Sequence, residues 1–356
     1  MNTSSSERLY HLDAMRGVLM LLGVLLHSAQ VFNPHRTWLI SSNACTPLAT
    51  VTVAFIHLFR MPAFFALSGL FCLLTVQRSS PRILVTTRFK RILIPLVTTA
   101  LTVNTAQALI LKGTGWKDYT LVTYISNGEW VMHLWFLINL LVYFAVTYLL
   151  LQVPSVRRTG NAIAGVMIRV PATVLLAILP ISHILVLALA KVGFPLYSVA
   201  WGFWETYSLM TYAPYFLFGM ALSVKPDLMV RLSNINILFI GGTLLLAMVA
   251  LQMPPNRIKD AYCNALISWA CVCLCFRIFA LVPIRPAVAR FISDASFNIY
   301  LFHHLFVVAI GLLLIQLGVP GLTGMLLLVL LVTGCSFVVN AGVKQSVTLR
   351  LGFNGR

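Results

Sequence analysis

Arginine and histidine side chains occur inside apolar stretches of this sequence, where an ionisable group is costly and is a candidate for function. Arg16 and His27 lie eleven residues apart in the first stretch. On a helix they share one face, with His27 about 16 Å further along the axis. Asp13 precedes Arg16 by three residues and can pair with it. We expect Arg16 near a membrane surface and His27 near mid-membrane.

His27 in that position is suited to act as a general base. A covalent acyl-imidazole on His27 is one alternative. The other is structural: an arginine that reaches back to the lipid headgroups and a histidine that only packs.

The ninth apolar stretch is polar for a membrane segment. It reads FISDASFNIYLFHHLF and carries Asn298, Tyr300, His303 and His304. Tyr300 lies three and four residues before the two histidines, so the three side chains are neighbours on a helix. A membrane helix with these residues is expected to face a cavity rather than lipid.

Two further pairs have helical spacing. His57 and Arg60 are three residues apart beside Pro62, which frees a backbone carbonyl. Glu129 and His133 are four apart at the start of the fourth stretch, among tryptophans typical of a membrane interface. We expect each pair to be neighbours on one helix. For His57 and Arg60 the alternative is a structural pair at the outer mouth.

Arginines gather between the second and third stretches. Arg78 follows one stretch, and Arg88 and Arg91 open the next in RFKRILIPLV. Guanidinium groups bind phosphate through paired N–H donors, so these residues and Arg16 form a candidate clamp for a phosphate-rich ligand. Anchoring at the membrane surface is the alternative.

The histidines match no metal motif. HExxH is absent, and no two histidines are four residues apart. No metal site is therefore expected. A haem between His27 and His303 or His304 would need ligands on facing helices, and the absence of a motif disfavours it.

The elements that must position these residues are membrane helices. The 356 residues are 60% hydrophobic and 9% charged, whereas soluble domains carry about 25% charged residues. The sequence predicts an all-α, polytopic membrane protein that forms one membrane-embedded domain over 1–356. A window of about 20 apolar residues gives ten spans: 14–33, 48–76, 92–111, 129–152, 171–190, 196–223, 235–253, 261–282, 292–316 and 321–343.

The loop charges predict the orientation. The chain has 25 Lys and Arg against 8 Asp and Glu, a net charge of +17. One set of alternate loops, which includes both termini, holds most of the basic residues. The positive-inside rule therefore predicts both termini in the cytoplasm. Nucleic acid is not an expected partner, because the basic residues separate apolar runs.

At this point the sequence resembles a known family. Arg16, ten residues and then His27 are similar to the first-helix signature of the membrane-bound acyltransferase-3 family. The resemblance spans nearly the whole chain through four further segments: SGLF (68–71), the basic run ending at Pro95, MHLWFL (132–137) and NIYLFHH (298–304). Leu305 departs from the family pattern, which often has proline after the histidine pair.

The resemblance implies about ten helices and transfer of an acyl group from cytoplasmic acyl-CoA to a hydroxyl outside. HRTWLI and IHLFRMPAFFALSGLF are similar in particular to members that succinylate osmoregulated periplasmic glucans. This similarity implies succinyl-CoA as the donor substrate and a glucan as the acceptor, with no bound cofactor. It also implies a location in the bacterial inner membrane and a glucan synthase as a candidate partner. The alternatives are O-acetylation of another surface polysaccharide or lipid-linked sugar, a transporter or flippase, and a structural subunit. No internal repeat supports a transporter.

The expected roles complete this prediction. His27 would be the base, while His303 or His304 would polarise the thioester, orient the acceptor or relay a proton. Arg36 and Arg60 are candidates for the succinate carboxylate. The expected site is catalytic His27, His303, His304 and Tyr300; donor-binding Arg16, Asp13, Arg78, Arg88 and Arg91; and acceptor- or acyl-binding His57, Arg60, His133 and Asn298.

Overall fold

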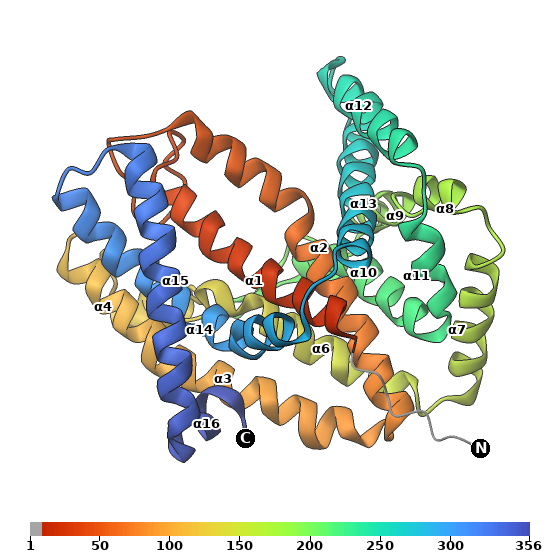
Figure 1. Ribbon diagram of the computed structural model, residues 1–356, viewed down its shortest axis with the longest axis horizontal. Coiled ribbons are helices and arrows are strands. Elements are labelled where there is room, and N and C mark those ends of the chain that lie inside the picture. Colours follow the sequence, from red (N-terminus) through yellow and green to blue (C-terminus); the bar gives the residue numbers. More distant parts are fainter. Residues whose placement is uncertain (1–8) are drawn as a thin grey trace.

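The long apolar stretches form helices, because a segment in lipid must satisfy its backbone hydrogen bonds internally. The computed structural model describes residues 9–356. In this part the only strands are β1 (Val199–Ala200) and β2 (Trp204–Glu205), which pair antiparallel. All other regular structure is helical (Figure 1). The expected all-α class is confirmed.

Within residues 9–356, eight helices or helical runs are long and apolar enough to cross a membrane. They are α1 (Tyr10–Val31), α2 (Pro47–Arg78), Leu84–Gly113, Met132–Leu150, Ala172–Lys191, α13 (Arg257–Leu281), α14 (Pro286–Gln316) and α15 (Gly321–Gln345). A ninth span arises if α11 (Pro226–Ser233) and α12 (Ile237–Gln252), bent by 76°, are counted as one. The protein is therefore a polytopic membrane protein.

Three of these runs contain more than one element. Leu84–Gly113 comprises the π-helix η1 (Leu84–Phe89), α3 (Lys90–Thr99), the π-helix η2 (Ala100–Asn104) and α4 (Thr105–Gly113). Met132–Leu150 joins the 3₁₀-helix η3 (Met132–Leu134) to α6 (Trp135–Leu150), and Ala172–Lys191 joins α8 (Ala172–Ile178) to α9 (Ile181–Lys191). Shorter helices are α5 (Leu121–Ser126), α7 (Pro154–Met167) and α16 (Val347–Asn354).

The span expected at 196–223 differs from the prediction. The segment begins with the β1–β2 hairpin, and only then does α10 (Thr206–Val224) start. Its first turns are polar, so α10 is not among the eight membrane-crossing candidates. It packs very closely on α2: a Cβ at Gly69 would lie 1.9 Å from the Phe216 carbonyl oxygen. Glycine allows this approach of two helix backbones.

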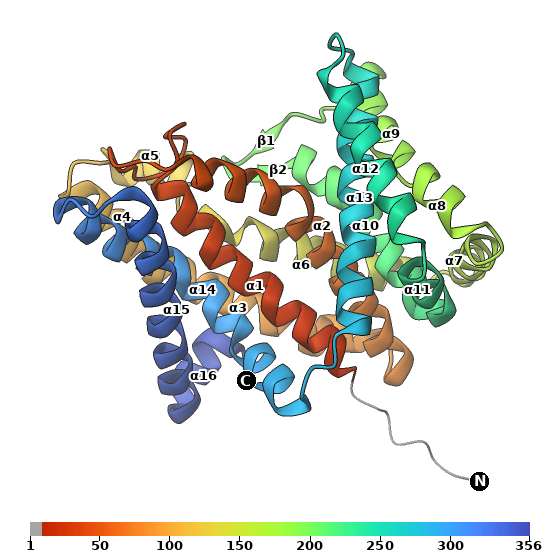
Figure 2. The ribbon, with the colours of Figure 1, turned by 45° about the horizontal axis from the view of Figure 1, so that its top comes forward.

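α1 lies in the middle of the molecule and packs against α2, α14 and α15 (Figures 1 and 2). Two glycines let its neighbours approach. A Cβ at Gly17 would lie 2.4 Å from Ile292 on α14, and one at Gly23 would lie 2.1 Å from Arg60 on α2. The helix that carries Arg16 and His27 is therefore held between the helices that carry the other candidate residues.

The start of α1, the end of α2 and the C-terminal α16 lie at the same end of the molecule (Figures 1 and 2). Gly355, with a positive φ of 61°, packs against Arg91 at the start of α3. This end corresponds to the basic loops, and we refer to it as the predicted cytoplasmic end. The orientation itself remains a prediction from loop charge.

Candidate active site

Four imidazole rings from three segments form one cluster, which we call the histidine cluster: His27, His133, His303 and His304. His27 lies 5.3 Å from His303 and 4.9 Å from His304 between ring centroids. His133, on η3, stacks on His304 at 4.7 Å and lies 5.4 Å from His303. The structure thus brings together histidines that the sequence separates by almost 300 residues.

Two residues that the sequence reasoning did not propose complete this cluster. Trp38, in the loop between α1 and α2, lies 5.6 Å from His27 and 5.1 Å from His304. On α4, the Oε1 atom of Gln107 lies 3.0 Å from the Nδ1 atom of His304. Trp38 is part of the HRTWLI segment, which was a usable signal. Gln107 has no comparable signal, because a single amide in an apolar stretch has many structural explanations.

His303 has a defined proton arrangement. Its Nδ1 lies 2.9 Å from the Ile299 carbonyl oxygen and 2.8 Å from that of Tyr300. Carbonyl oxygens only accept, so Nδ1 carries the proton and donates it. Nε2 is left with a lone pair, is buried, and has no hydrogen-bond partner within residues 9–356. This nitrogen is free to accept a proton or a hydrogen bond from a substrate.

His27 and His133 also carry nitrogens without a well-aligned hydrogen bond. Nδ1 of His27 has no hydrogen-bond partner in the described chain. Neither ring nitrogen of His133 makes a well-aligned hydrogen bond there, although the backbone of Tyr300 and Leu301 lies close to the ring. Buried polar atoms are normally hydrogen-bonded, so several exceptions in one place need a functional explanation. His133, His303 and His304 are 7%, 3% and 4% exposed. His27 is less completely buried, so a substrate reaches the cluster most easily at His27.

Arg60 brings a positive charge to this cluster. A Cβ at Gly23 would lie 2.1 Å from Arg60 Nη1 and 3.8 Å from His303 Nε2, so both groups border the same point on α1. The Arg60 Nε is buried without a partner, and Nη2 contacts only the Met61 sulfur at 3.5 Å. No described carboxylate pairs with Arg60. The guanidinium is therefore available to an anionic ligand or intermediate.

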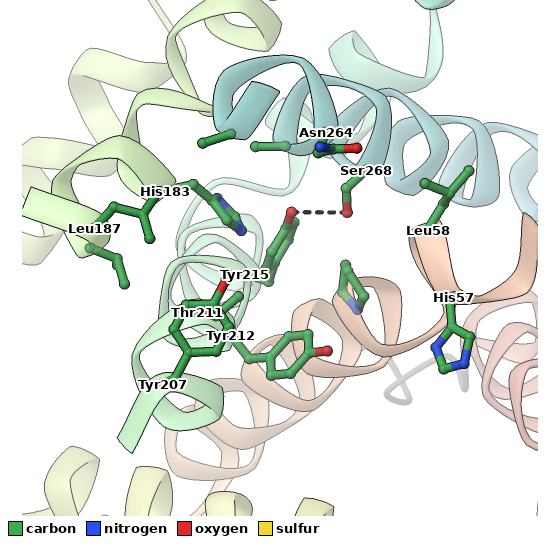
Figure 3. A pocket seen from close by; sticks show the side chains of 14 residues that line it. His57, Leu58, His183, Leu187, Tyr207, Thr211, Tyr212, Tyr215, Asn264 and Ser268 are labelled. Atoms are coloured by element: carbon green, nitrogen blue, oxygen red, sulfur yellow. Dashed lines mark hydrogen bonds between the residues drawn. The ribbon is translucent and has the colours of Figure 1, made fainter. Parts of the chain in front are cut away.

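The predicted neighbours His57 and Arg60 point to different places. His57 contacts Gln30 at 3.3 Å and borders a cavity of about 300 Å³ between α2, α9, α10 and α13. Figure 3 shows His57 on one side of this cavity and His183 on the other, with the Tyr215 hydroxyl bonded to Ser268 at 2.9 Å. His57 thus lies outside the histidine cluster.

Glu129 and His133 are also separated. Met132 has a positive φ of 45°, and η3 begins only there. Glu129 therefore lies in a turn before the helix, and the expected shared helix face does not form. His133 turns into the histidine cluster, while Glu129 lines a different cavity.

Tyr300 and Asn298 are differently placed on α14. The Tyr300 ring lies 5.3 Å from His133, and its hydroxyl donates to the His133 carbonyl oxygen at 2.6 Å. Tyr300 therefore borders the cluster and fixes the backbone of η3. Asn298 donates to Asn340 on α15 at 2.9 Å, away from the cluster. Arg36 bonds Asn43 at 2.9 Å in the exposed loop.

A second group, which we call the arginine cluster, lies at the predicted cytoplasmic end: Arg16, Arg88, Arg91 and Arg356. Arg88 is within electrostatic range of the other three and donates to the Thr75 hydroxyl at 2.6 Å. Of the expected donor residues, Arg78 is exposed at the end of α2, and no contact joins it to this cluster in the described chain. Arg356 is an additional member that the sequence did not indicate.

Arg16 is held by two neighbours. It pairs with Asp13 at 3.5 Å and donates to the Ser293 hydroxyl on α14. Ser293 in turn donates to Asp13 at 3.3 Å. The expected Asp13–Arg16 pair is confirmed. The two clusters lie on the same helix, and eleven residues of α1 separate Arg16 from His27, about 16 Å.

Within residues 9–356, no group of three or more His, Cys, Asp or Glu side chains is placed to hold a metal ion. The imidazole rings of the histidine cluster are acid–base groups in their own right. Its chemistry would be proton transfer and stabilisation of negative charge in a site with little water.

Comparisons with known proteins agree with the sequence resemblance. The acyltransferase-3 family profile, described as an acyltransferase domain, matches residues 9–341. Glucans biosynthesis protein C of Escherichia coli strain SMS-3-5 is 33% identical over 149 residues, and that of strain K12 is 32% identical. The match covers 40% of this chain and 38% of each relative's length. No solved structure matches.

Proposed function

This chain belongs to the acyltransferase-3 family, and we propose that it transfers a succinyl group from succinyl-CoA to hydroxyls of a periplasmic glucan across the bacterial inner membrane. The observation that carries the proposal is the histidine cluster beside Arg60, which has no carboxylate partner within residues 9–356. The similarity to glucans biosynthesis protein C supports the glucan acceptor.

His27 is the proposed base, because it is the least buried member of the histidine cluster. It removes the proton from the attacking sugar hydroxyl as that oxygen bonds to the thioester carbonyl carbon. The carbon–sulfur bond then breaks, and the proton on His27 passes to the departing CoA thiolate. The products are an ester and CoA–SH, so no other reactant is needed. A histidine base in this role accelerates reactions about 10²–10⁴-fold.

Arg60 is proposed to act on the carbonyl side, while the lone pair of His303 Nε2 suits it to orient the acceptor hydroxyl. In the tetrahedral intermediate the former carbonyl oxygen becomes negative, and a nearby guanidinium stabilises it. Arg60 borders the same point as His303 Nε2. Its charge also suits the free carboxylate of a succinyl group, which an acetyl group lacks. This second role for Arg60 is the basis for proposing succinyl.

The arginine cluster is the proposed site for the phosphates of CoA. Guanidinium groups pair with phosphate through two parallel hydrogen bonds. With the phosphates held near Arg16 and Arg88, the pantetheine arm would extend along α1 toward His27, about 16 Å away. The donor would thus reach the histidine cluster while CoA stays on the cytoplasmic side. A glucan synthase that supplies the acceptor is a proposed partner.

The test is a transfer assay on the whole protein in lipid nanodiscs. Succinyl-CoA and a linear glucan are supplied, free CoA thiol is measured, and the glucan mass is determined. We expect a gain of the succinyl mass on the glucan, and its loss in the His27→Ala variant. Transfer of acetyl but not succinyl would overturn the succinyl assignment. Absence of transfer from every acyl-CoA by folded protein would overturn the acyltransferase mechanism.

A further inference from the structure

A cavity of about 480 Å³ lies beside the histidine cluster and is not used by the mechanism above. It lies between the segment 127–135 and the segment 202–212, and it includes Asn127, Glu129, Trp135, Glu205 and Tyr212. Its volume is within the range of small-molecule sites, about 300–1,000 Å³. We propose that this cavity binds a sugar ring of the carbohydrate acceptor, an inference that rests on the proposed function.

The lining chemistry suits a neutral polyol. The chain has only eight acidic residues against 25 basic ones, yet Glu129 and Glu205 both face this cavity. A carboxylate accepts hydrogen bonds from neighbouring hydroxyl groups. Two carboxylates at one site repel an anion, which argues against CoA phosphate or succinate as the occupant.

Aromatic rings supply the second element of sugar recognition. Trp135 and Tyr212 stack 5.6 Å apart, and both line the cavity, as does Tyr207. Aromatic faces are negative at the centre and attract the C–H groups of a sugar ring, while the tyrosine hydroxyls supply hydrogen bonds. Apolar faces beside a few placed polar groups are typical of ligand sites.

The two carboxylates are placed differently. Glu205 precedes α10; its side chain caps no helix amide and is exposed, so it can turn toward a ligand. Burial, and then the nearby Glu129 carboxylate, raise the pKa of Tyr119 to about 12. The Tyr119 hydroxyl therefore stays protonated beside Glu129.

The backbone builds this cavity in a specific way. Gly128 and Gly202 have positive φ angles of 67° and 73°. A Cβ at Gly128 would lie 2.3 Å from the Gly202 carbonyl oxygen. The turn before η3 and the β1–β2 hairpin therefore pack backbone to backbone, which only glycine permits. Both loops belong to the side predicted to face the periplasm, where the acceptor is found.

The cavity and the proposed active site share one stretch of chain. Met132 and Trp135 line the cavity, while His133 between them belongs to the histidine cluster. Tyr212 lies within electrostatic range of Glu205 and of Arg60. A sugar bound against Tyr212 would therefore present a hydroxyl toward Arg60 and the cluster.

The experiment uses Glu205→Gln and Glu129→Gln in the whole protein, with Asp118→Asn as a matched control. Asp118 is exposed on the same predicted side and does not line the cavity. The probe is a short linear glucan, and its binding is measured by saturation-transfer NMR without donor. We expect each glutamine variant to weaken binding about tenfold, the effect of one lost hydrogen bond to a charged group. Asp118→Asn should bind normally.

Steady-state kinetics then separate this proposal from the proposed function. Each glutamine variant should raise the KM for glucan about tenfold and leave the KM for succinyl-CoA unchanged. Wild-type transfer with an unaltered glucan KM in both variants would overturn the cavity assignment alone. Glucan binding that depends on Glu205 without any acyl transfer would support the cavity and overturn the proposed function. Binding of Ca²⁺ in place of glucan would overturn the sugar assignment.

Discussion

The histidine cluster and the arginine cluster lie on the same helix but differ in how their polar groups are satisfied. Arg16 has a carboxylate and a hydroxyl as partners, and Arg88 has the Thr75 hydroxyl. In the described part of the chain, His27 Nδ1 and His303 Nε2 of the histidine cluster are buried without hydrogen-bond partners. Arg16 and Arg88 are thus each held by a hydroxyl partner, although Arg91 Nε is also buried without a partner within residues 9–356. In the histidine cluster, His27 and His303 each keep one nitrogen free.

This difference is what two separate tasks would need. A phosphate site must hold charged groups near water with defined geometry, and local partners provide that. A reaction centre needs nitrogens with free lone pairs in a site where water does not compete. We therefore expect changes in the histidine cluster to lower kcat and changes in the arginine cluster to raise the KM for donor.

The largest expected effect is that of His27→Ala. If His27 is the base, its removal should lower kcat about 10²–10⁴-fold with little change in either KM. Turnover of succinyl-CoA with glucan in nanodiscs measures this directly. His35→Ala is the matched control, because His35 is exposed in the loop after α1. A kcat within twofold of wild type, in protein that melts normally, would remove His27 from the mechanism.

Arg60→Gln should have the next largest effect. Loss of one group that stabilises an oxyanion lowers kcat about 10²–10³-fold. If Arg60 also binds the succinyl carboxylate, kcat/KM should fall further for succinyl-CoA than for acetyl-CoA. The ratio of the two values in wild type and variant is the measurement. An equal fall for both donors would restrict Arg60 to the oxyanion, and no fall for either would contradict both roles.

Gly23→Ala tests the geometry between the two helices rather than the chemistry of a side chain. The added Cβ would lie 2.1 Å from Arg60 Nη1, so the guanidinium must leave its position beside Gly23. The far end of a flexible side chain moves at little cost, and alanine favours helix over glycine by about 0.5–1 kcal/mol. We expect unchanged or slightly higher thermal stability with about tenfold lower kcat, because a small misplacement of a reacting group is costly.

Gly242→Ala is the control for this substitution, because a Cβ there meets nothing within 4 Å. It should leave both stability and kcat close to wild type. Loss of stability in Gly23→Ala in proportion to its loss of activity would contradict the geometric argument, because packing alone would then explain the result.

The sequence predicted the helices and the shared face of Arg16 and His27, because helical periodicity is a local property. It also predicted the residues of α14 that join the histidine cluster. It was wrong about Glu129 and His133, since the positive φ of Met132 delays the start of the helix. Of the ten expected spans, 196–223 differs: a hairpin precedes α10, whose first turns are polar, so α10 is not among the eight to nine membrane-crossing candidates within residues 9–356.

Other parts of the site depend on tertiary packing and could not be read from spacing. His57 and Arg60 are about 60° apart around a helix. One side chain can therefore face a cavity while the other faces α1. Gln107 meets His304 only because α4 packs on α14. Arg356 reaches the arginine cluster because α16 packs on α3.

The smallest expected effect is that of Arg88→Gln. The arginine cluster keeps Arg16 and Arg91 when Arg88 is changed, so we expect the KM for succinyl-CoA to rise about fivefold to tenfold with kcat nearly unchanged. The increase should shrink at high salt, because charge interactions near water are screened. Arg82→Gln is the control, since Arg82 is exposed in the helical turn just before η1. A lower kcat with an unchanged KM would mean that Arg88 acts on the reaction, and the division of tasks between the two clusters would not hold.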